Sequence, residues 1–355
     1  MGTGDRHDKG VMPEHDESSP KSRKRSKPVT ALAWVIAALL APLCLAWVAG
    51  QWVYWFDILA SQQMLIGWVA LALGSLMLAV RRWVAGSVCV VLAMVSLYPV
   101  FVGRVWLLPS IDLEHKPDGV IRVVSFNVLP LNELWRTNFE TILRYDADIF
   151  VLLEAHPELS RSIRKRGLLE TTPYTSWGHR PWVDQETSSA FILSQWPAEV
   201  IRAKDDDGLG QHHLYMRVES PLGKVIIGLM HPASPRTQAR WIRGNKVIES
   251  QASVSQQIQA MTGLPVLVGA DLNAGPAQRR ARTLRKAGLR MSKPVLHPDG
   301  SFPANTTIPS VLRIQLDDVW SLGNIQPVAW EMIELKGSDH QAIIVDFKVV
   351  GRPDS

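Results

Sequence analysis

Three long apolar runs near the start of the chain restrict its fold more than any other feature. They cover residues 29–50, about 64–80 and 83 to about 102, with short connections between them. A membrane-spanning helix needs about 20 consecutive apolar residues, so we predict three transmembrane helices within residues 29–108. A cleaved signal peptide would account for the first run alone, but two further apolar runs follow it.

Lysine and arginine residues lie on one side of these runs. A basic cluster at residues 21–27 precedes the first run, and Arg81-Arg82 separates the second from the third. The connection between the first two runs contains Asp57 and no Lys or Arg. Cytoplasmic loops carry the excess of basic residues, so we expect a multi-pass cell-membrane protein with a cytoplasmic N-terminus and an extracytoplasmic C-terminal domain. If the second run only re-enters the membrane, that domain would face the cytoplasm.

Composition sets further limits. Residues 1–28 are rich in polar and charged residues and predict a disordered basic tail, whose end could contact membrane lipids. Both cysteines, Cys44 and Cys89, lie in the apolar runs, which excludes a disulfide or cysteine zinc site in the rest of the chain. Basic and acidic residues are nearly balanced over 120–350, although the whole chain has a formal net charge of +5. A dedicated nucleic-acid-binding face is therefore not expected.

Residues 120–350, after a linker predicted at 109–119, have the pattern of one mixed domain. Short runs rich in branched residues predict strands, and three segments have helical spacing. The predicted strands are 120–126, 147–153, 190–194, 214–218, 225–230, 264–268, 316–322 and 342–349, and the predicted helices are 134–145, 237–261 and 278–287. Many strands with a few helices between them indicate an α/β sandwich of two sheets with helices outside.

Polar residues stand where several of these strands begin or end. Taken singly, each has a simpler explanation as a turn residue, a solvated strand end or a rim histidine. Together they form a set that can hold a hard divalent cation, activate water and bind a phosphate group. The set, in chain order, is Asn127, Glu154, His231, Asp271, Asn273, Asp317, Asp339 and His340.

This order of residues resembles the endonuclease/exonuclease/phosphatase superfamily, which includes DNase-I-like nucleases, sphingomyelinases and inositol-phosphate phosphatases. The resemblance covers about residues 120–350 and implies a four-layered α/β/β/α sandwich. The family's usual Gly-Asp-x-Asn begins with Ala270 in this chain, and Asp318 stands where His or Tyr is common. The matching pieces are Ser-Phe-Asn-Val at 125–128, Glu154, Ser194, Gly-Ala-Asp-Leu-Asn at 269–273, Leu-Asp at 316–317 and Ser-Asp-His at 338–340.

The resemblance implies a metal site and a catalytic set. Asn127 and Glu154 would help to hold Mg²⁺, with Mn²⁺ able to substitute, and Asp339 would assist either the metal or the neighbouring histidine.

In the catalytic set, Asp271 would position or deprotonate the attacking water. Asn273 and His231 would bind phosphate oxygens. Asp317 would orient His340, which would contact the phosphate.

The apolar runs narrow the class of phosphate. The layout resembles a membrane-anchored branch associated with glycopeptide (teicoplanin-type) resistance, thought to act on polyprenyl-linked phosphate. Arg236, Arg240 and Arg243 would share a helix face and could grip a diphosphate, although a solvated basic face is the alternative. Trp241 is expected to meet the lipid interface. The basic run at 279–286 is expected to contact solvent or lipid headgroups.

The sequence therefore predicts a membrane-anchored, Mg²⁺-dependent phosphoesterase that hydrolyses a lipid-linked phosphate or diphosphate at the outer membrane face and could confer glycopeptide resistance. The alternatives are a membrane-tethered nuclease or phosphodiesterase and a non-catalytic membrane sensor domain. Which bond is cleaved, the length of the lipid and the oligomeric state stay open.

Overall fold

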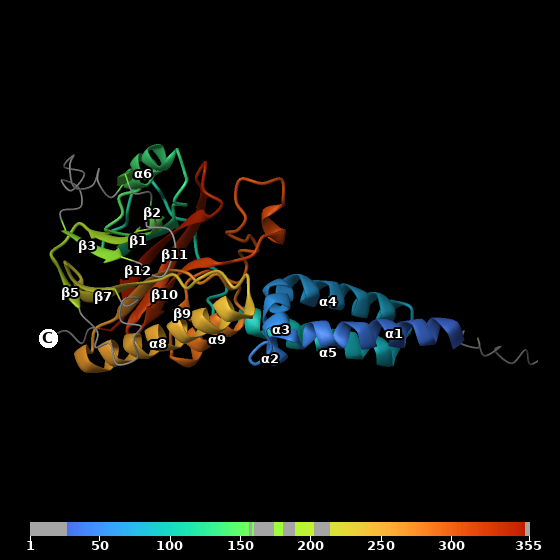
Figure 1. The fold of residues 1–355 in the computed structure, drawn as a ribbon. Helices are drawn as coiled ribbons and strands as arrows, with labels where there is room; N and C mark the ends of the chain where they lie inside the picture. Colours follow the sequence, from blue (N-terminus) through green and yellow to red (C-terminus); the bar gives the residue numbers. More distant parts are fainter. Residues whose placement is uncertain (1–26, 156–157, 160–173, 180–188, 202–213, 352–355) are drawn as a thin grey trace, which may run out of the picture.

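A computed structural model describes residues 27–155, 158–159, 174–179, 189–201 and 214–351. The chain forms an elongated N-terminal bundle of helices and a rounded sandwich domain at one end of it (Figure 1). The predicted tail, residues 1–28, lies almost wholly outside the described residues.

The N-terminal bundle consists of residues 27–101. Three of its segments, Pro28–Ala49, Tyr54–Ala79 and Trp83–Phe101, are long and apolar enough to cross a membrane. These segments agree with the three predicted spans, although the second begins ten residues earlier than expected. The elements are α1 (Lys27–Cys44), α2 (Ala46–Ala49), α3 (Tyr54–Leu59), η1 (Ala60–Gln62), α4 (Gln63–Ala79) and α5 (Trp83–Phe101).

Small residues let the helices of the bundle approach closely. A Cβ atom added at Gly67 would lie 2.6 Å from Leu97, and one at Gly74 would lie 2.9 Å from Val90. Both glycines are on α4 and both neighbours are on α5, so this pair of helices depends on the missing side chains.

Two six-stranded sheets form the sandwich domain. The first has the order β11-β12-β1-β2-β4-β3 and the second has the order β5-β6-β7-β8-β10-β9. The strands are β1 (Ile121–Asn127), β2 (Ile149–Ala155), β3 (Tyr174–His179), β4 (Ser189–Ser194), β5 (Ala198–Ile201), β6 (Tyr215–Ser220), β7 (Gly223–Met230), β8 (Val266–Asp271), β9 (Arg290–Met291), β10 (Asp317–Leu322), β11 (Ile325–Glu334) and β12 (Gln341–Val349).

Helices cover the outer faces of both sheets, as the resemblance implied. Helix α6 (Trp135–Leu143) packs on the first sheet through Trp135, Phe139 and Ile142. Helices α8 (Gln238–Thr262) and α9 (Arg279–Lys286) pack on the second. A third apolar cluster, which includes Val151 and Leu267, lies between the sheets. The architecture is therefore the predicted four-layered α/β/β/α sandwich.

Four strands were not predicted from the sequence: β3, β5, β9 and β11. The longest, β11, contains Pro327 beside a register shift in its pairing with β12. Proline removes a backbone donor and is confined to edge strands and bulges, and β11 is an edge strand. The proline therefore obscured a real strand.

A buried aspartate joins the bundle to the sandwich. Asp57 on α3 is 2% exposed, and its Oδ2 accepts a 2.7 Å hydrogen bond from the indole Nε1 of Trp241 on α8. Its Oδ1 accepts a 2.7 Å bond from the backbone N–H of Arg279, at the start of α9. The Tyr54 hydroxyl donates to the Pro235 carbonyl at 2.9 Å. The expectation that Trp241 meets the lipid interface is wrong, because this carboxylate and the ring of Tyr54 bury it.

A second junction follows the end of α5. The guanidinium of Arg104 donates to the backbone carbonyls of Lys293 (3.0 Å) and Pro294 (2.7 Å). The next residues pair with the sandwich through the backbone, where Val295 N–H donates to the Val105 carbonyl at 2.8 Å. The bundle is therefore fixed to the sandwich on two sides.

We predict that Asp57→Ala destabilises this junction. The indole N–H of Trp241 and the amide of Arg279 would both lose their acceptor, at roughly 1–3 kcal/mol for each buried donor left without a partner. The measurement is the thermal unfolding midpoint of the full chain in detergent. Asp118→Ala, at an exposed position, is the control, and equal midpoints for the two variants would contradict the prediction.

Candidate active site

The order and direction of the strands bring the predicted site residues to one edge of the sandwich. Strands β1 and β2 are parallel, as are β7 and β8, so their carboxyl ends coincide. Asn127 and Glu154 stand at the first pair of ends, and His231 and Asp271 at the second. Strand β10 is antiparallel to β8 and begins at the same edge, where Asp317 pairs with Asp271.

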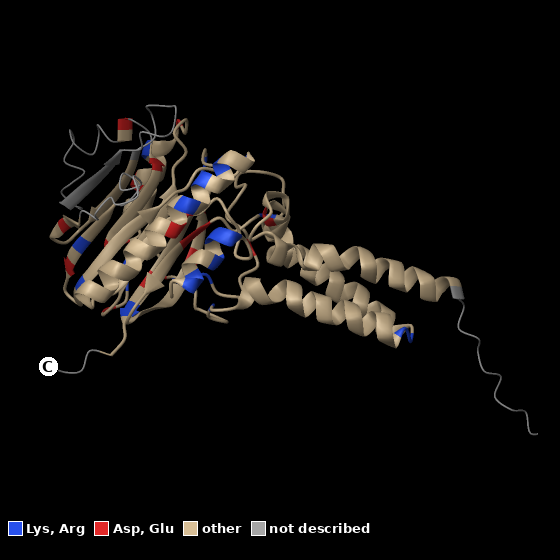
Figure 2. Cartoon of the chain, turned by 60° about the horizontal axis from the view of Figure 1, so that its bottom comes forward, with Lys and Arg blue, Asp and Glu red and all other residues tan. Residues whose placement is uncertain are grey.

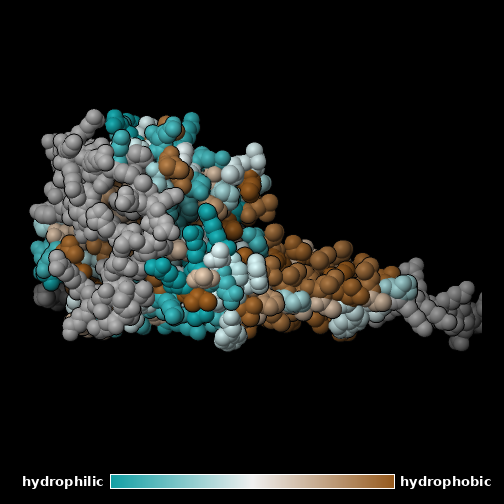
Figure 3. All heavy atoms as spheres, viewed as in Figure 1, coloured by the Kyte–Doolittle hydropathy of each residue, from teal (hydrophilic) through white to brown (hydrophobic). Residues whose placement is uncertain are grey.

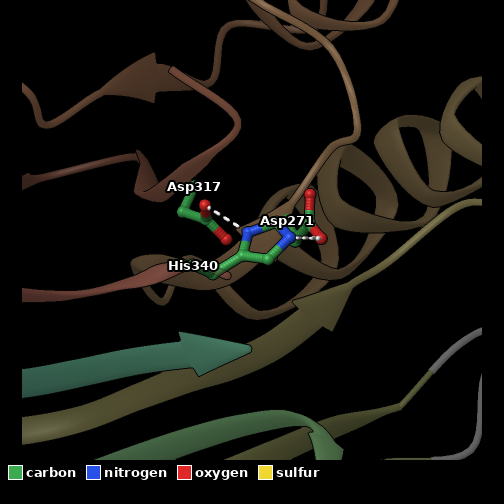
Figure 4. Close-up of side chains that lie close together, drawn as sticks. All are labelled: Asp271, Asp317 and His340. Atoms are coloured by element: carbon green, nitrogen blue, oxygen red, sulfur yellow. Dashed lines mark hydrogen bonds and ion pairs between the residues drawn. The ribbon is translucent and has the colours of Figure 1, made fainter. Parts of the chain in front are cut away.

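An imidazole lies between two carboxylates at the centre of this edge (Figure 4). The Nδ1 atom of His340 is 2.8 Å from Asp317 Oδ2, and its Nε2 atom is 3.8 Å from Asp271 Oδ2. Ser301 steadies the pair by donating a 2.7 Å hydrogen bond to Asp317 Oδ2. All three central side chains are buried, so their charges interact more strongly than they would in water.

Neighbouring charges decide the protonation of this group. Burial by itself lowers the pKa of His340, but Asp317 and Asp271 outweigh burial and raise that pKa to about 10. Burial raises the pKa of Asp271, but the positive charge of His340 and the hydrogen bond with His231 outweigh it and hold that pKa well below its usual value. The imidazole of His340 is therefore the cation and Asp271 is a carboxylate at neutral pH. Burial raises the pKa of Asp317, although the positive charge of His340 opposes that rise.

A second imidazole, that of His231, contacts the carboxylates of Glu154 and Asp271. His231 Nε2 is 2.9 Å from Glu154 Oε1 and 3.4 Å from Asp271 Oδ2. The Asn127 amide donates to Asp271 Oδ2 at 2.9 Å, and the Asn273 backbone donates to Asp271 Oδ1 at 2.8 Å. Asp271 is thus the acceptor that unites the site residues of the two sheets.

Local backbone strain turns Glu154 towards the site. Its φ angle is +49°, and the pairing of β2 with β4 shifts register between Leu152 and Ala155. Asn273 also has a φ of +49°. Such conformations cost of order 1–3 kcal/mol for residues other than glycine and occur at functional sites.

The donor set fits a hard divalent cation. Four carboxylates, those of Glu154, Asp271, Asp317 and Asp339, surround two imidazoles. The carboxylates outnumber the imidazoles by four to two, so a bound cation would offset the formal charge that remains. The Oδ1 atom of Asp339 is buried and accepts no hydrogen bond among the described residues. Carboxylate and amide oxygens are the ligands that Mg²⁺ prefers.

Asp271, Asp317 and His340 also come close enough together to hold a metal ion, with ligand atoms within 4.8 Å of one another. An imidazolium has no free lone pair for a metal, however, so this group acts better as an ion-paired acid and base. The resemblance assigns the metal instead to Asn127, Glu154 and Asp339, and all three residues line the cavity described below.

A cavity of about 720 Å³ opens over these residues. This volume is in the range of small-molecule sites, ~300–1,000 Å³. Arg236, Arg240 and Arg243 line one wall. Another part of the wall comes from the bundle, through Ile58 and Ser61. Seven of the eight predicted residues line this cavity. The eighth, Asp317, lies behind the cavity surface and contacts His340.

A sequence model of the Endonuclease/Exonuclease/phosphatase family matches residues 124–340, a stretch that contains the whole site. The chain belongs to this family. Family members are divalent-metal-dependent hydrolases of phosphoester bonds, which agrees with the excess of carboxylates in the cavity.

Solved structures share the fold of this family domain at low sequence identity. An endonuclease/exonuclease/phosphatase from Beutenbergia cavernae DSM 12333 superposes with a TM-score of 0.51 at 16% identity, over 66% of this chain and 73% of its own. One from Bacteroides vulgatus superposes with a TM-score of 0.51 at 14% identity, over 65% of this chain and 99% of its own. No curated protein sequence matched the chain.

Two further residues of the family pattern lie away from the cavity. Ser194 pairs with Ile149 at the start of β2, whereas the site lies at the carboxyl end of that strand. Ser194 is therefore at the opposite end of the strands from the cavity. Asp318 faces away from the site, as alternation along β10 requires, and accepts a 2.9 Å hydrogen bond from the Lys293 backbone. Burial raises the pKa of Asp318 to about 6, although that bond opposes the rise.

The basic run at 279–286 does not behave as a solvent or headgroup surface throughout. Arg280 is 1% exposed and donates to the carbonyls of Leu272 (2.8 Å) and Ala233 (2.9 Å). It therefore positions both the Asp271–Asn273 turn and the segment after His231. The prediction was wrong at Arg280 because charge patterning alone does not reveal a buried guanidinium. Gly244, which leaves room for this side chain, was the available signal.

We predict that His340→Ala lowers turnover by about 10²–10⁴-fold, the usual contribution of a positioned acid or base. The measurement is hydrolysis of bis(p-nitrophenyl) phosphate by the full-length protein with Mg²⁺. His115→Ala removes an imidazole that is 83% exposed and is the matched control. Activity close to wild type in the His340 variant, with the control also active, would exclude the proposed role of this imidazole.

Proposed function

We propose that this protein is a membrane-anchored, Mg²⁺-dependent phosphoesterase that hydrolyses a lipid-linked phosphate or diphosphate at the outer membrane face. The observation that carries the proposal is the composition of the cavity wall. Ile58 and Ser61, from the second apolar segment, line the same cavity as His340 and Asp271. A phosphate bound there would lie at the end of helices that are apolar enough to cross a membrane.

The two junctions support a fixed placement of the cavity. Asp57 links the bundle to α8 and α9, and Arg104 links it to the segment before the 296–316 loop. A domain tethered only by a flexible linker could turn its site towards soluble substrates. A domain held on two sides keeps the cavity at one height above the lipid.

The distribution of charge supports the outer face. Residues 28–80 and 83–101 of the bundle contain no Lys or Arg, and Arg81 and Arg82 stand between these two stretches. Figure 2 shows Lys and Arg of the bundle only at its end far from the sandwich. Basic residues favour the cytoplasmic side. The sandwich, at the other end of the bundle, would then be extracytoplasmic.

Three arginines would bind the charged group of the substrate. Arg240 and Arg243 line the cavity from the first two turns of α8, and all three arginines are exposed. Arg236 lines the cavity from the segment just before that helix, so the expected single helix face holds only for Arg240 and Arg243. Guanidinium groups bind phosphate oxygens through paired hydrogen bonds. Three of them suit a diphosphate better than a neutral headgroup.

The site residues can carry the hydrolysis. Mg²⁺ held by Asn127, Glu154 and Asp339 would supply charge neutralisation for the phosphate oxygens. The low pKa of Asp271 keeps it ionised, so its carboxylate can accept a hydrogen bond from the attacking water and position it. Asp317 holds the Nδ1–H of His340. Its Nε2–H, at 3.8 Å from Asp271, is beyond hydrogen-bond distance and can donate to a phosphate oxygen.

Asn273 and His231 would add further donors to the phosphate, next to Asp271. Preorganised donors of this kind stabilise the charge that develops in the transition state. We propose glycopeptide resistance as the biological outcome, on the basis of the resemblance in architecture.

The first experiment measures phosphate release from detergent-dispersed undecaprenyl diphosphate by the full-length protein, with and without Mg²⁺. We expect metal-dependent release that Glu154→Gln abolishes, because the amide cannot replace a charged ligand. Glu133→Gln is the control, because Glu133 is exposed and lies just before α6. This variant should behave as wild type. Cleavage of DNA without release from the lipid would identify a membrane-tethered nuclease instead.

We also predict that Arg240→Ala lowers kcat/KM for the lipid diphosphate by roughly tenfold to a hundredfold, since a charge-assisted hydrogen bond contributes about 1.5–3 kcal/mol. Lys246→Ala is the control, because Lys246 is an exposed cation of α8 that does not line the cavity. Equal effects of the two substitutions would mean that Arg240 attracts the substrate only through its charge, as any surface cation would, and does not bind it.

A further inference from the structure

A second hollow continues from the catalytic cavity towards the outer surface of the bundle. The two share Ser61 and Ile314. From there the second hollow runs between the start of α4, at Met64 and Leu65, and the η4 segment (Ser310–Leu312). Its volume is about 50 Å³, far below the ~300–1,000 Å³ of small-molecule sites. It has room for a narrow segment of a ligand and not for a bulky group.

Apolar side chains face the hollow without being covered. Leu65 is 45% exposed, Val311 is 51% exposed and Leu312 is 47% exposed. Exposed apolar groups that cluster on two separate elements mark a site for an apolar partner. In Figure 3 the hydrophobic surface of the loop that contains η4 lies above the hydrophobic surface of the bundle.

The charged residues Lys293, Arg104 and Arg313, which line the hollow, are engaged with protein atoms. Lys293 Nζ donates to Gln315 Oε1 at 2.7 Å, and Arg104 donates to backbone carbonyls. Arg313 donates to Glu334 Oε2 at 3.2 Å. The surface offered to a ligand at Leu65, Val311 and Leu312 is therefore hydrocarbon.

This surface continues along α4 on its outer face. Trp68 and Val69 follow Leu65 at i+3 and i+4, which places the three on one side of the helix. They are 48% and 45% exposed. An apolar path thus leads from the catalytic cavity, past Ser61 and Leu65, to the part of the bundle that would face lipid.

We infer that this hollow is a subsite for the hydrocarbon chain of the substrate, and that the chain reaches the phosphate site from the bilayer along α4. This role rests on the proposed function. The subsite, next to the phosphate cavity, would make the protein select substrates with a long lipid chain. The occupant is a prenyl chain attached to the phosphate, because the path joins the phosphate cavity to the apolar face of a predicted span.

The loop that forms one side of the subsite is well fixed. Phe302 and Ile314 exchange two backbone hydrogen bonds, of 3.0 and 2.7 Å. The ring of Phe302 lies 4.9 Å from that of His340. The same hairpin therefore contacts the catalytic imidazole and carries the apolar residues of the subsite.

The test compares undecaprenyl diphosphate with dimethylallyl diphosphate, which has the same charged group on a short chain. Full-length wild type and Val311→Ser/Leu312→Ser are assayed in one detergent with Mg²⁺. We expect the ratio of kcat/KM for the long over the short substrate to fall about tenfold in the double variant, which corresponds to ~1.4 kcal/mol. Ile308→Ser is the matched control, because Ile308 is 40% exposed on the same loop but lines neither hollow.

The outcomes separate the two proposals. If wild type hydrolyses both substrates and the double variant leaves the ratio unchanged, the subsite is wrong and the proposed function stands. An equal loss on both substrates would also overturn the subsite, because the effect would then act through His340. If wild type hydrolyses neither substrate, the proposed function fails and the subsite fails with it.

A second measurement does not depend on turnover. A prenyl diphosphate analogue with a photoreactive diazirine on its chain is bound to the full-length protein, irradiated and mapped by mass spectrometry. Label on residues 61–65 or 311–314 supports the subsite. Label confined to other parts of the chain overturns it.

Discussion

The carboxylate of Asp57 is the interaction on which the arrangement of the two halves depends. It binds one donor on α8 and one at the start of α9. Helix α8 carries Arg240 and Arg243 of the cavity wall, and α9 carries Arg280, which holds the Asp271–Asn273 turn. A single buried side chain of the bundle is therefore connected, through two helices, to both the phosphate-binding wall and the catalytic turn.

Charge balance explains how the site can exist. Four carboxylates at one sheet edge would repel one another and any phosphate if two imidazoles were their only partners. Pairing His340 with Asp317 and Asp271 stabilises the imidazolium, and the family's divalent cation supplies the charge that is still missing. In the proposed function, the three arginines that line the same cavity would act on the substrate.

Much of the fold and site could be predicted because both depend on local patterns. Polar residues at strand ends predicted eight residues that the structure brings close together, and apolar length predicted the three possible spans. Burial against distant elements could not be predicted in this way. Trp241 and Arg280 have the sequence context of a surface helix, yet each is buried by a partner far along the chain, Asp57 for the first and the Leu272 and Ala233 carbonyls for the second. Strand β11 was missed because its proline is tolerated only at a sheet edge, which sequence alone does not reveal.

The contribution of the bundle to the cavity was the feature that was hardest to predict from the sequence. Ile58 and Ser61 lie in the connection between the first two predicted spans, and the family pattern begins only after residue 120. Neither residue was therefore predicted to belong to the site. The structure places that connection against the catalytic cavity. An anchor that only tethered the sandwich would need no such contact, because any linker keeps a domain near a surface. Direct participation in the cavity wall implies that the bundle helps to determine which substrates reach His340. Under the proposed function, lipid-linked substrates would follow the same helices to the site.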